Sequence, residues 1–549
     1  MQRLAPVVLA VVVMLPRLAS AQFGLLDDGL TLATGRETLG RWSSVLTLIP
    51  ETGRFFPAYW LTYAAVFGVV GLRPHAFFAV NVLLLAVLLV LLARLVRVAG
   101  GTRRHAAVAL VVFAVCGPAI EAFYTLSKAE PLQLMWIAIS LLAAAASARA
   151  RRWPAHAALL ALTAAALLVA HATKETSLVL VPISLGWLAI EWASRAASPA
   201  ASRFARSYAA VSVVAAAAFL LLRAYYAALP LGQGWYTRAY TLQAETVGPA
   251  LFRLGAWIVR DFAFVLPLLA AALVALRGRP TELARPILYA CVWMAGWLAV
   301  YAPWPATFEY YLLPFAFGAA LFTGLVAGEL WQARARGAPR ATRRVVWPTL
   351  AASALLWLAT VVNAAADARV QLAVDRANAD LIDALAPLPR GTRVVLNTDV
   401  NEYLYELPLH LSELKHRSDL VVVPVSAPAR GDARESQHRG DVVVITPRIA
   451  DPPRPTVRIA VHEGGAGRDA ARLRELLDTG GALLYTTERR AQVIELGMHR
   501  LLCRVARPPF ADPTYCPGDR GVVAVRTFTY GWQVHGLTRS PVRRVETRP

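Results

Sequence analysis

Residues 75–96 read HAFFAVNVLLLAVLLVLLARLV, in which the first ionised side chain is that of Arg94. An apolar run of this length is long enough to cross a bilayer as one α-helix. Similar stretches recur through the first two-thirds of the chain, at 4–22, 105–122, 131–148, 155–172, 177–193, 207–228, 255–276, 286–303, 310–329 and 345–364. We therefore predict a polytopic α-helical membrane protein with about eleven transmembrane helices.

The composition agrees with this prediction. Of the 549 residues, 57% are hydrophobic and 17% are charged, and the mean hydropathy is +0.48. Soluble domains have roughly 45–50% apolar and about 25% charged residues. The composition therefore excludes a collagen-like chain, a disordered chain and a small disulfide framework.

Arginines follow alternate predicted spans and so orient the chain. Short loops rich in Lys and Arg stay in the cytoplasm, which makes the loops between them outward-facing. A large share of the net charge of +21 is then explained by cytoplasmic arginines that orient the chain in the membrane, and we predict no nucleic-acid partner. The basic loops hold 18 arginines: Arg94, Arg97, Arg103, Arg104, Arg149, Arg151, Arg152, Arg195, Arg203, Arg206, Arg277, Arg279, Arg285, Arg334, Arg336, Arg340, Arg343 and Arg344.

Two apolar stretches near the N-terminus need separate interpretation. Residues 4–16 followed by Ala19-Ser20-Ala21 resemble a signal peptide with a cleavage site. An uncleaved first helix is the preferred interpretation, because the residues that follow it look like part of a site. Residues 57–72 are short and aromatic, which predicts a helix along the membrane interface.

The chain is expected to divide into a membrane domain, residues 1–365, and a C-terminal extracytoplasmic α/β domain, residues 366–549. An odd number of spans places the second part outside. Cys503 and Cys516 lie there and could form a disulfide or remain two buried thiols. Short β-rich runs alternate with helical ones: strands are predicted at 393–397, 420–425, 441–446, 457–461 and 483–486, and helices at 401–414 and 469–477.

Asp27 and Asp28 open the first outward loop, at the edge of a hydrophobic helix. A low-dielectric boundary raises the pKa of a carboxyl group. One of the pair could then act as a general base toward a hydroxyl, or the two could bind a divalent cation such as Mg²⁺ or Mn²⁺. The alternative is an Asp-Asp-Gly turn that caps a helix.

Lysine is rare in this chain, and two of the three lysines lie in tight outward loops. Lys128 stands two residues before Glu130, and Lys174 directly precedes Glu175. Charges this close to hydrocarbon are usually paired or functional. A simple ion pair is one interpretation of Lys174 and Glu175, and Glu130-Pro131 is also a plausible helix start. In the other, the ammonium groups bind a phosphate and the acids orient them.

Three further residues extend this set. Glu309 and Tyr310 open the last outward loop and could contact a sugar, although an aromatic belt explains the tyrosine equally well. Arg54 precedes the interfacial stretch and is a further candidate phosphate contact. The loops thus present acids, lysines and aromatic side chains on one face.

These motifs resemble the GT-C superfamily of polytopic glycosyltransferases, in particular bacterial protein O-mannosyltransferases and aminoarabinose transferases. The resemblance covers about residues 1–365. It rests on Asp27-Asp28, Gly53-Arg-Phe-Phe-Pro57, Ser127-Lys-Ala-Glu130-Pro131, Ala172-Thr-Lys-Glu175-Thr176 and Glu309-Tyr-Tyr-Leu-Leu-Pro314.

The resemblance implies a glycosyltransferase of the bacterial inner membrane that takes its sugar from a polyprenyl-phosphate-linked donor. The acceptor would be a hydroxyl of a protein, lipid or polysaccharide at the outer face. Asp27 or Asp28 would be the catalytic base or a metal ligand. Other residues would have supporting roles: Lys174, Lys128 and Arg54 for the donor phosphate, and Glu130, Glu175, Glu309 and Tyr310 for orienting substrate.

Two other functions stay open. A transporter or flippase of envelope components would need polar groups at mid-bilayer and internal repeats, whereas the charges here gather at the outer surface. A non-catalytic envelope scaffold would keep the same fold with an inactive site.

Overall fold

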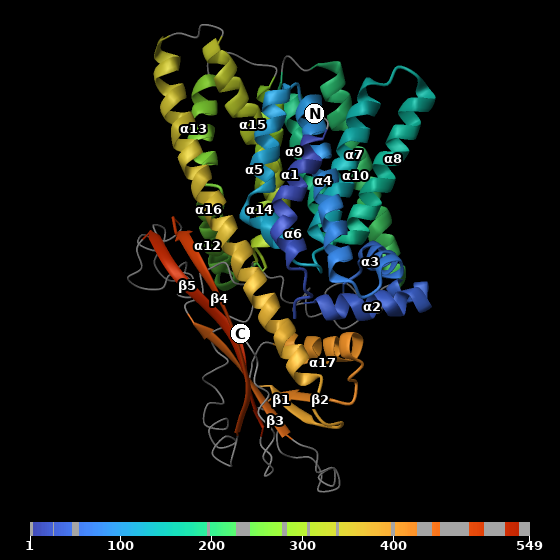
Figure 1. Cartoon of the computed structure of the whole chain (residues 1–549). Coiled ribbons are helices and arrows are strands. Elements are labelled where there is room, and N and C mark those ends of the chain that lie inside the picture. The colour runs from blue at the N-terminus through green and yellow to red at the C-terminus, as the bar shows by residue number, and fades with distance from the viewer. Residues whose placement is uncertain are drawn as a thin grey trace.

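The computed structural model describes residues 4–25, 27–46, 54–194, 198–226, 242–276, 283–304, 308–335, 340–396, 401–424, 442–450, 482–498 and 522–536. A bundle of helices forms one part of the molecule, and a β-sheet lies beyond one end of it (Figure 1). The long helix α16 (Arg340–Leu385) runs from the bundle to the sheet. We call the end of the bundle that faces the sheet the site end.

Within the described ranges, seven helical segments are long and apolar enough to cross a membrane. Two further pairs are bent at a short break, and the count becomes nine if each pair is one span. The pairs are α5 (Arg103–Ala114) with α6 (Gly117–Tyr124), bent by 60°, and α12 (Ala244–Asp261) with α13 (Val265–Leu276), bent by 89°. The seven are α4 (Pro74–Val98), α7 (Glu130–Arg149), α8 (Trp153–Thr173), η3 and α9 (Glu175–Ala193), α10 (Pro199–Tyr226), η4 and α15 (Glu309–Gln332), and Val346–Leu385 of α16.

The two remaining predicted spans correspond to shorter or less apolar helices. The predicted span 4–22 is α1 (Ala5–Ala19), and 286–303 is α14 (Ala284–Tyr301). Both helices lie in the same bundle (Figure 1). Each predicted stretch thus falls on one helix or on one bent pair, and the polytopic helical fold is confirmed.

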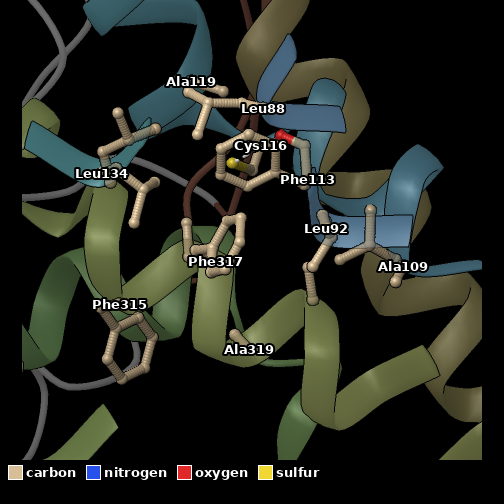
Figure 2. Packing of buried hydrophobic residues seen from close by; sticks show 14 of the residues in the cluster. Leu88, Leu92, Ala109, Phe113, Cys116, Ala119, Leu134, Phe315, Phe317 and Ala319 are labelled. Carbon is tan, nitrogen blue, oxygen red and sulfur yellow. Dashed lines mark hydrogen bonds between the residues drawn. The ribbon is translucent and has the colours of Figure 1, made fainter. Parts of the chain in front are cut away.

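Close packing of small and aromatic side chains holds the centre of the bundle together. Figure 2 shows α4, α5 and α15 meeting there. Phe113 and Phe317 lie edge to face with ring centroids 5.6 Å apart, and Ala109 and Ala319 are fully buried between neighbouring helices. In lipid, helices associate through such contacts because lipid tails are as apolar as the side chains. Cys116 also lies in this core.

Two helices cover the site end of the bundle. Helix α2 (Asp28–Gly40) lies across it, roughly perpendicular to the bundle helices (Figure 1). Helix α3 (Pro57–Val70) has 14 residues, a length of about 21 Å at 1.5 Å per residue, which is shorter than a bilayer's hydrocarbon core. Its predicted place along the membrane interface stays a prediction.

The C-terminal part contains a mixed sheet of five described strands in the order β2-β1-β3-β5-β4. Strand β1 (Arg393–Leu396) pairs in parallel with β2 (Val421–Pro424) and β3 (Val442–Ala450), and α17 (Asn401–Lys415) connects β1 to β2. Strand β5 (Val523–Gly536) pairs antiparallel with β3 and with β4 (Ala482–Leu496). The α/β character is confirmed, but β5 was not among the predicted strands. The predicted elements at 457–461 and 469–477, and Cys503 and Cys516, lie outside the described residues.

Helix α16 belongs to both parts. It has 46 residues and continues unbroken through residues 365 and 366, where the sequence places the division. The sheet packs on its C-terminal half, where the side-chain oxygen of Asn378 accepts hydrogen bonds from Tyr530 (3.2 Å) and Trp532 (3.0 Å). A single helix therefore ties the sheet to the site end of the bundle.

Candidate active site

The first loop at the site end presents the carboxylate of Asp27. This residue precedes α2 in the left-handed conformation, with φ of +66°, which is uncommon for a residue other than glycine. Its side chain is 34% exposed and lies 3.7 Å from the Lys128 ammonium. The hydroxyl of Tyr405 donates a hydrogen bond of 3.1 Å to its other oxygen. Asp27 is thus a partly exposed carboxylate between a cation and a phenol.

Asp28, the next residue, is buried. Its Oδ2 accepts a hydrogen bond from the backbone N–H of Gly24 (2.7 Å), and its Oδ1 has no hydrogen-bond partner among the described residues. Burial raises the pKa of Asp28 to about 7, against the lowering effects of the Gly24 N–H and of Lys128. The raised pKa predicted for one carboxyl of this pair therefore belongs to Asp28.

A buried ion pair stabilises the loop that carries Asp27 and Asp28. Arg17, in the last turn of α1, is fully buried and pairs with Asp375 of α16 at 2.8 Å. The same guanidinium donates to the carbonyl of Gln22 (2.8 Å) and lies 3.9 Å above the Phe78 ring. Sequence reasoning missed this pair. An arginine inside an apolar helix was the available signal, because such a charge needs a partner.

Lys128 and Lys174 come from different loops and meet over one aromatic ring. Their ammonium groups lie 5.0 and 5.6 Å from the centre of the Tyr310 ring, and Lys174 also lies 4.4 Å from that of Tyr311. Both lysine side chains are buried. The structure thus brings together three predicted site residues that are far apart in the sequence.

Lys174 is held by α7. Its ammonium pairs with Glu130, the first residue of that helix. One turn later, Gln133 donates to Ser177 Oγ at 2.7 Å and to the Lys174 carbonyl at 3.3 Å. Burial lowers the pKa of Lys174 to about 8, although Glu130 opposes the shift. The ammonium is therefore mostly charged at neutral pH and loses its proton at a pH that an enzyme assay can reach.

Glu175 and Arg54 lie beside this lysine. Glu175 accepts a hydrogen bond from the backbone N–H of Phe55 (2.6 Å) and lies 3.8 Å from Arg223. Arg54 stacks on Phe56 at 4.3 Å, and its charge contributes to the lowered pKa of Lys174. Glu175 thus holds the backbone next to Arg54 in place. This role does not depend on a contact between Glu175 and Lys174.

The turn η4 (Glu309–Leu312) connects the lysines to a second charged group. The backbone N–H of Tyr310 donates to Glu121 of α6 at 2.8 Å, which fixes the turn. The Glu309 carboxylate lies 3.3 Å from Arg260. The structure therefore separates two neighbouring predicted residues, Tyr310 with the lysines and Glu309 with an arginine.

Arg260 stands at the break between α12 and α13, and its side chain is fully buried. Its guanidinium contacts three carboxylates: Asp261 at 3.0 Å, Glu309 at 3.3 Å and Asp367 of α16 at 2.8 Å. Gly117 makes room for this group, since a Cβ there would lie 1.7 Å from a Glu309 oxygen. We call these four charged residues the arginine cluster, and Asp27, Lys128, Glu130, Lys174 and Tyr310 the lysine cluster.

The C-terminal part also contributes to the site. Tyr405 and Glu406 of α17 contact Asp27 and the first turn of α2, respectively. The sequence predicts the helix but not this contact. The available signal was the pairing of Glu406 with His410, one turn apart and beside the buried residues Leu407 and Leu411.

Asp27 and Asp28 are the predicted ligands of a divalent cation. In the part of the chain that the structure describes, no group of three or more His, Cys, Asp and Glu side chains is placed to hold a metal ion. Asp27 instead faces Lys128 and Tyr405, and Asp28 accepts from a backbone N–H.

Comparison with known proteins supports a fold assignment. No protein-family model matches the chain, and no curated protein matches its sequence. Among solved structures, ArnT from Cupriavidus metallidurans bound to undecaprenyl phosphate matches with a TM-score of 0.52 and 14% identity, over 98% of this chain and 98% of that chain. The same protein in the apo state gives a TM-score of 0.50 and 14% identity, over 97% of each chain.

A second protein shares the architecture over a smaller part. The oligosaccharyltransferase of Archaeoglobus fulgidus in the apo form matches with a TM-score of 0.50 and 11% identity, over 81% of this chain and 69% of that chain. At such identities the likeness concerns the fold. The chain shares the fold of these two solved membrane proteins.

Proposed function

We propose that this protein is a glycosyltransferase that moves a sugar from a polyprenyl-phosphate-linked donor to an acceptor hydroxyl. One observation carries the proposal: Asp27, Lys128, Tyr310 and Lys174 come from four separate loops and converge at one end of a bundle with the GT-C fold. A carboxylate can act as a general base toward a hydroxyl, and ammonium groups can stabilise the charge that develops on a leaving phosphate.

The lysine cluster is the proposed donor site. Lys128 and Lys174 would bind the phosphate oxygens, with Arg54 as a further cation beside them, while Glu130 keeps Lys174 in place. The ring of Tyr310 lies beneath both ammonium groups and would contact the sugar. An undecaprenyl phosphate bound to ArnT, which shares the fold, supports a lipid phosphate as ligand here.

Asp27 is the proposed base. Its carboxylate is partly exposed, whereas that of Asp28 is buried and accepts from Gly24. The acceptor hydroxyl would lose its proton to Asp27 as its oxygen bonds to the anomeric carbon. The bond from that carbon to the phosphate oxygen breaks, and the polyprenyl phosphate leaves with the electron pair. The lysines stabilise the negative charge that develops on the leaving phosphate.

The site end is proposed to face outward from a bacterial inner membrane. Helix α4 begins at Pro74 near the site end and ends with Arg94 and Arg97. Arg149, at the end of α7, donates to the carbonyl of Val98, so the arginine-rich helix ends lie together at the opposite end. Cytoplasmic arginines would place the site and the sheet outside. A reporter fused after Pro549 that proves cytoplasmic contradicts this orientation.

The direct test is transfer by the purified full-length protein. Polyprenyl-phosphate-linked hexoses and pentoses serve as donors, and protein, lipid and polysaccharide fractions serve as acceptors. Asp27→Asn should lower kcat by about 10²- to 10⁴-fold, the usual contribution of a general base. Asp380→Asn is the control, because this carboxylate pairs with Arg489 on the exposed surface of the C-terminal part.

Two outcomes would overturn the proposal. If the three single variants Asp27→Ala, Asp28→Ala and Lys174→Ala all transfer sugar at the wild-type rate, the catalytic assignment is wrong. If the wild type transfers no sugar from any donor, the proposed activity is wrong. Vectorial movement of a solute would then favour a transporter. Bent spans such as α12–α13 occur in that class. An EDTA arm tests metal dependence, and full activity in EDTA removes Asp27 and Asp28 as ligands of an essential ion.

A further inference from the structure

Helix α2 has an unusual N-terminal cap. Asp27 stands at the N-cap position, where Asp is among the preferred residues because its side chain accepts from the first N–H groups of the helix. Here the Asp27 side chain makes no such hydrogen bond. It contacts Lys128 and Tyr405 instead.

Glu406 of α17 takes this capping role from the far part of the chain. Its Oε2 accepts from the N–H of Gly29 at 2.7 Å, and its Oε1 accepts from the N–H of Leu30 at 2.9 Å. The two partners are 377 positions apart in the sequence, and the Glu406 side chain is fully buried. Both oxygens of one carboxylate therefore engage the first turn of α2.

The contact leaves no spare space. A Cβ on Gly29 would lie 2.6 Å from Nδ1 of His410 and 2.9 Å from Oε2 of Glu406. Glycine at this position thus allows α17 to approach α2 closely. On the same helix, the Tyr405 hydroxyl donates to Asp27, so consecutive residues of α17 contact Asp27 and the first turn of α2.

We propose that Glu406 is a positioning residue for the reaction, which holds the start of α2 so that Asp27 is directed to Lys128 and the donor site. The inference rests on the proposed function. Through Glu406, the C-terminal part sets the geometry of the proposed base. Misplacement of a reacting group by 1 Å can lower a rate by about 100-fold.

The test compares full-length wild type with Glu406→Ala, Glu406→Gln and the matched control Glu413→Ala. Glu413 is also a buried glutamate of α17 that contacts α2, but it pairs with Arg36 at 2.6 Å, two turns from the aspartates. If both glutamates only docked α17 on α2, Glu406→Ala and Glu413→Ala would lower kcat to a similar extent. Loss of positioning would affect only Glu406.

We expect Glu406→Ala to lower kcat by about 10- to 100-fold and to leave KM for the donor within about twofold, because Lys128 and Lys174, the proposed phosphate-binding residues, are not on α2 or α17 and keep their places. Glu406→Gln should restore part of the rate, since its amide keeps one acceptor oxygen. Glu413→Ala should stay close to the wild type. Equal kcat losses in Glu406→Ala and Glu413→Ala, or a change confined to KM, would overturn the inference.

Hydrogen–deuterium exchange separates this inference from the proposed function. In Glu406→Ala, the amides of Gly29 and Leu30 should exchange about tenfold faster, as expected when each N–H loses its hydrogen bond to a buried acceptor. If the wild type transfers no sugar, the proposed function fails, and faster exchange still establishes Glu406 as the residue that holds the aspartate loop. Unchanged exchange overturns the inference whether or not transfer occurs.

Discussion

The lysine cluster and the arginine cluster lie at the same end of the bundle and are joined by the turn η4, yet they are built differently. In the lysine cluster, two ammonium groups lie over one tyrosine ring, and the neighbouring Asp27 is one-third exposed. In the arginine cluster, a single guanidinium contacts three buried carboxylates. The comparison indicates that buried charge has two uses here.

The type of cation follows from these uses. A guanidinium has five fixed donors and stays charged, which suits a permanent contact with several carboxylates. An ammonium is a compact charge whose pKa responds to burial, which suits a group that must accept and release a ligand. The arginine cluster thus fixes the break between α12 and α13, while in the proposed function the lysine cluster binds the donor phosphate beside Asp27.

The largest expected effect is on the arginine cluster. Arg260→Ala would leave three carboxylates buried without their cation, and we expect a loss of about 3–5 kcal/mol in the free energy of unfolding. Denaturant titration of the detergent-solubilised protein measures this loss. Arg489→Ala is the control, because its pair with Asp380 is partly exposed and should contribute at most about 1 kcal/mol. Equal effects of the two substitutions would contradict the distinction.

The next effect concerns activity. Lys174→Ala should lower kcat/KM for transfer by about 10²- to 10³-fold, because it removes a preorganised cation from the leaving phosphate. Stability should change less than in Arg260→Ala, since only Glu130 loses its partner. The control is Lys415→Ala, which removes a lysine paired with Asp383 on the surface. A similar loss of activity in that variant would count against a specific role for Lys174.

A third effect is a pH dependence of stability at Asp28. The pKa of this carboxyl is about 7 when folded and 3.8 as its ordinary value. Between these pH values the folded protein holds a proton that the unfolded chain has lost, so stability falls as pH rises. From pH 5 to 7 we expect the wild type to lose about 2–3 kcal/mol relative to Asp28→Asn.

Denaturant titrations at several pH values measure this difference. Asp419→Asn is the control, because Arg417 holds the pKa of Asp419 below its ordinary value. Its stabilising effect is present above that ordinary value and is lost only at lower pH, so no change is expected from pH 5 to 7. A pH-independent gap between wild type and Asp28→Asn would show that Asp28 does not titrate in this range.

The smallest effect is in the alkaline limb of the activity profile. The pKa of Lys174 is lowered to about 8 by burial, so the ammonium is lost above that pH and transfer should fall about tenfold per pH unit. Arginine keeps its charge, and Lys174→Arg should remove this limb while lowering the maximal rate. Rates measured from pH 7 to 10 test this. An identical alkaline limb in both proteins would assign it to another group.

Much of the fold can be predicted from the sequence, because the length of an apolar stretch is a local property of the chain. The run at 75–96 is one helix, and the tight loop at Lys174 lies between two helices. The bends within the two bent helix pairs are harder to predict. Cys116-Gly117-Pro118 interrupts an apolar stretch, and the bend of 60° there depends on how α6 packs. Strand β5 was missed because its 14 residues contain many polar side chains and pair across the sheet with distant strands.

The sequence by itself determined the membrane-spanning architecture and the loops that carry Asp27, Lys128, Lys174 and Tyr310, because span length and residue type are encoded locally. Only the tertiary structure decided which side chains meet. Glu406 reaches Gly29 across 377 positions, and Asp367 reaches Arg260 across 107. The physical reason is that a buried charge or an open helix end needs a partner, but its position along the chain does not specify which one.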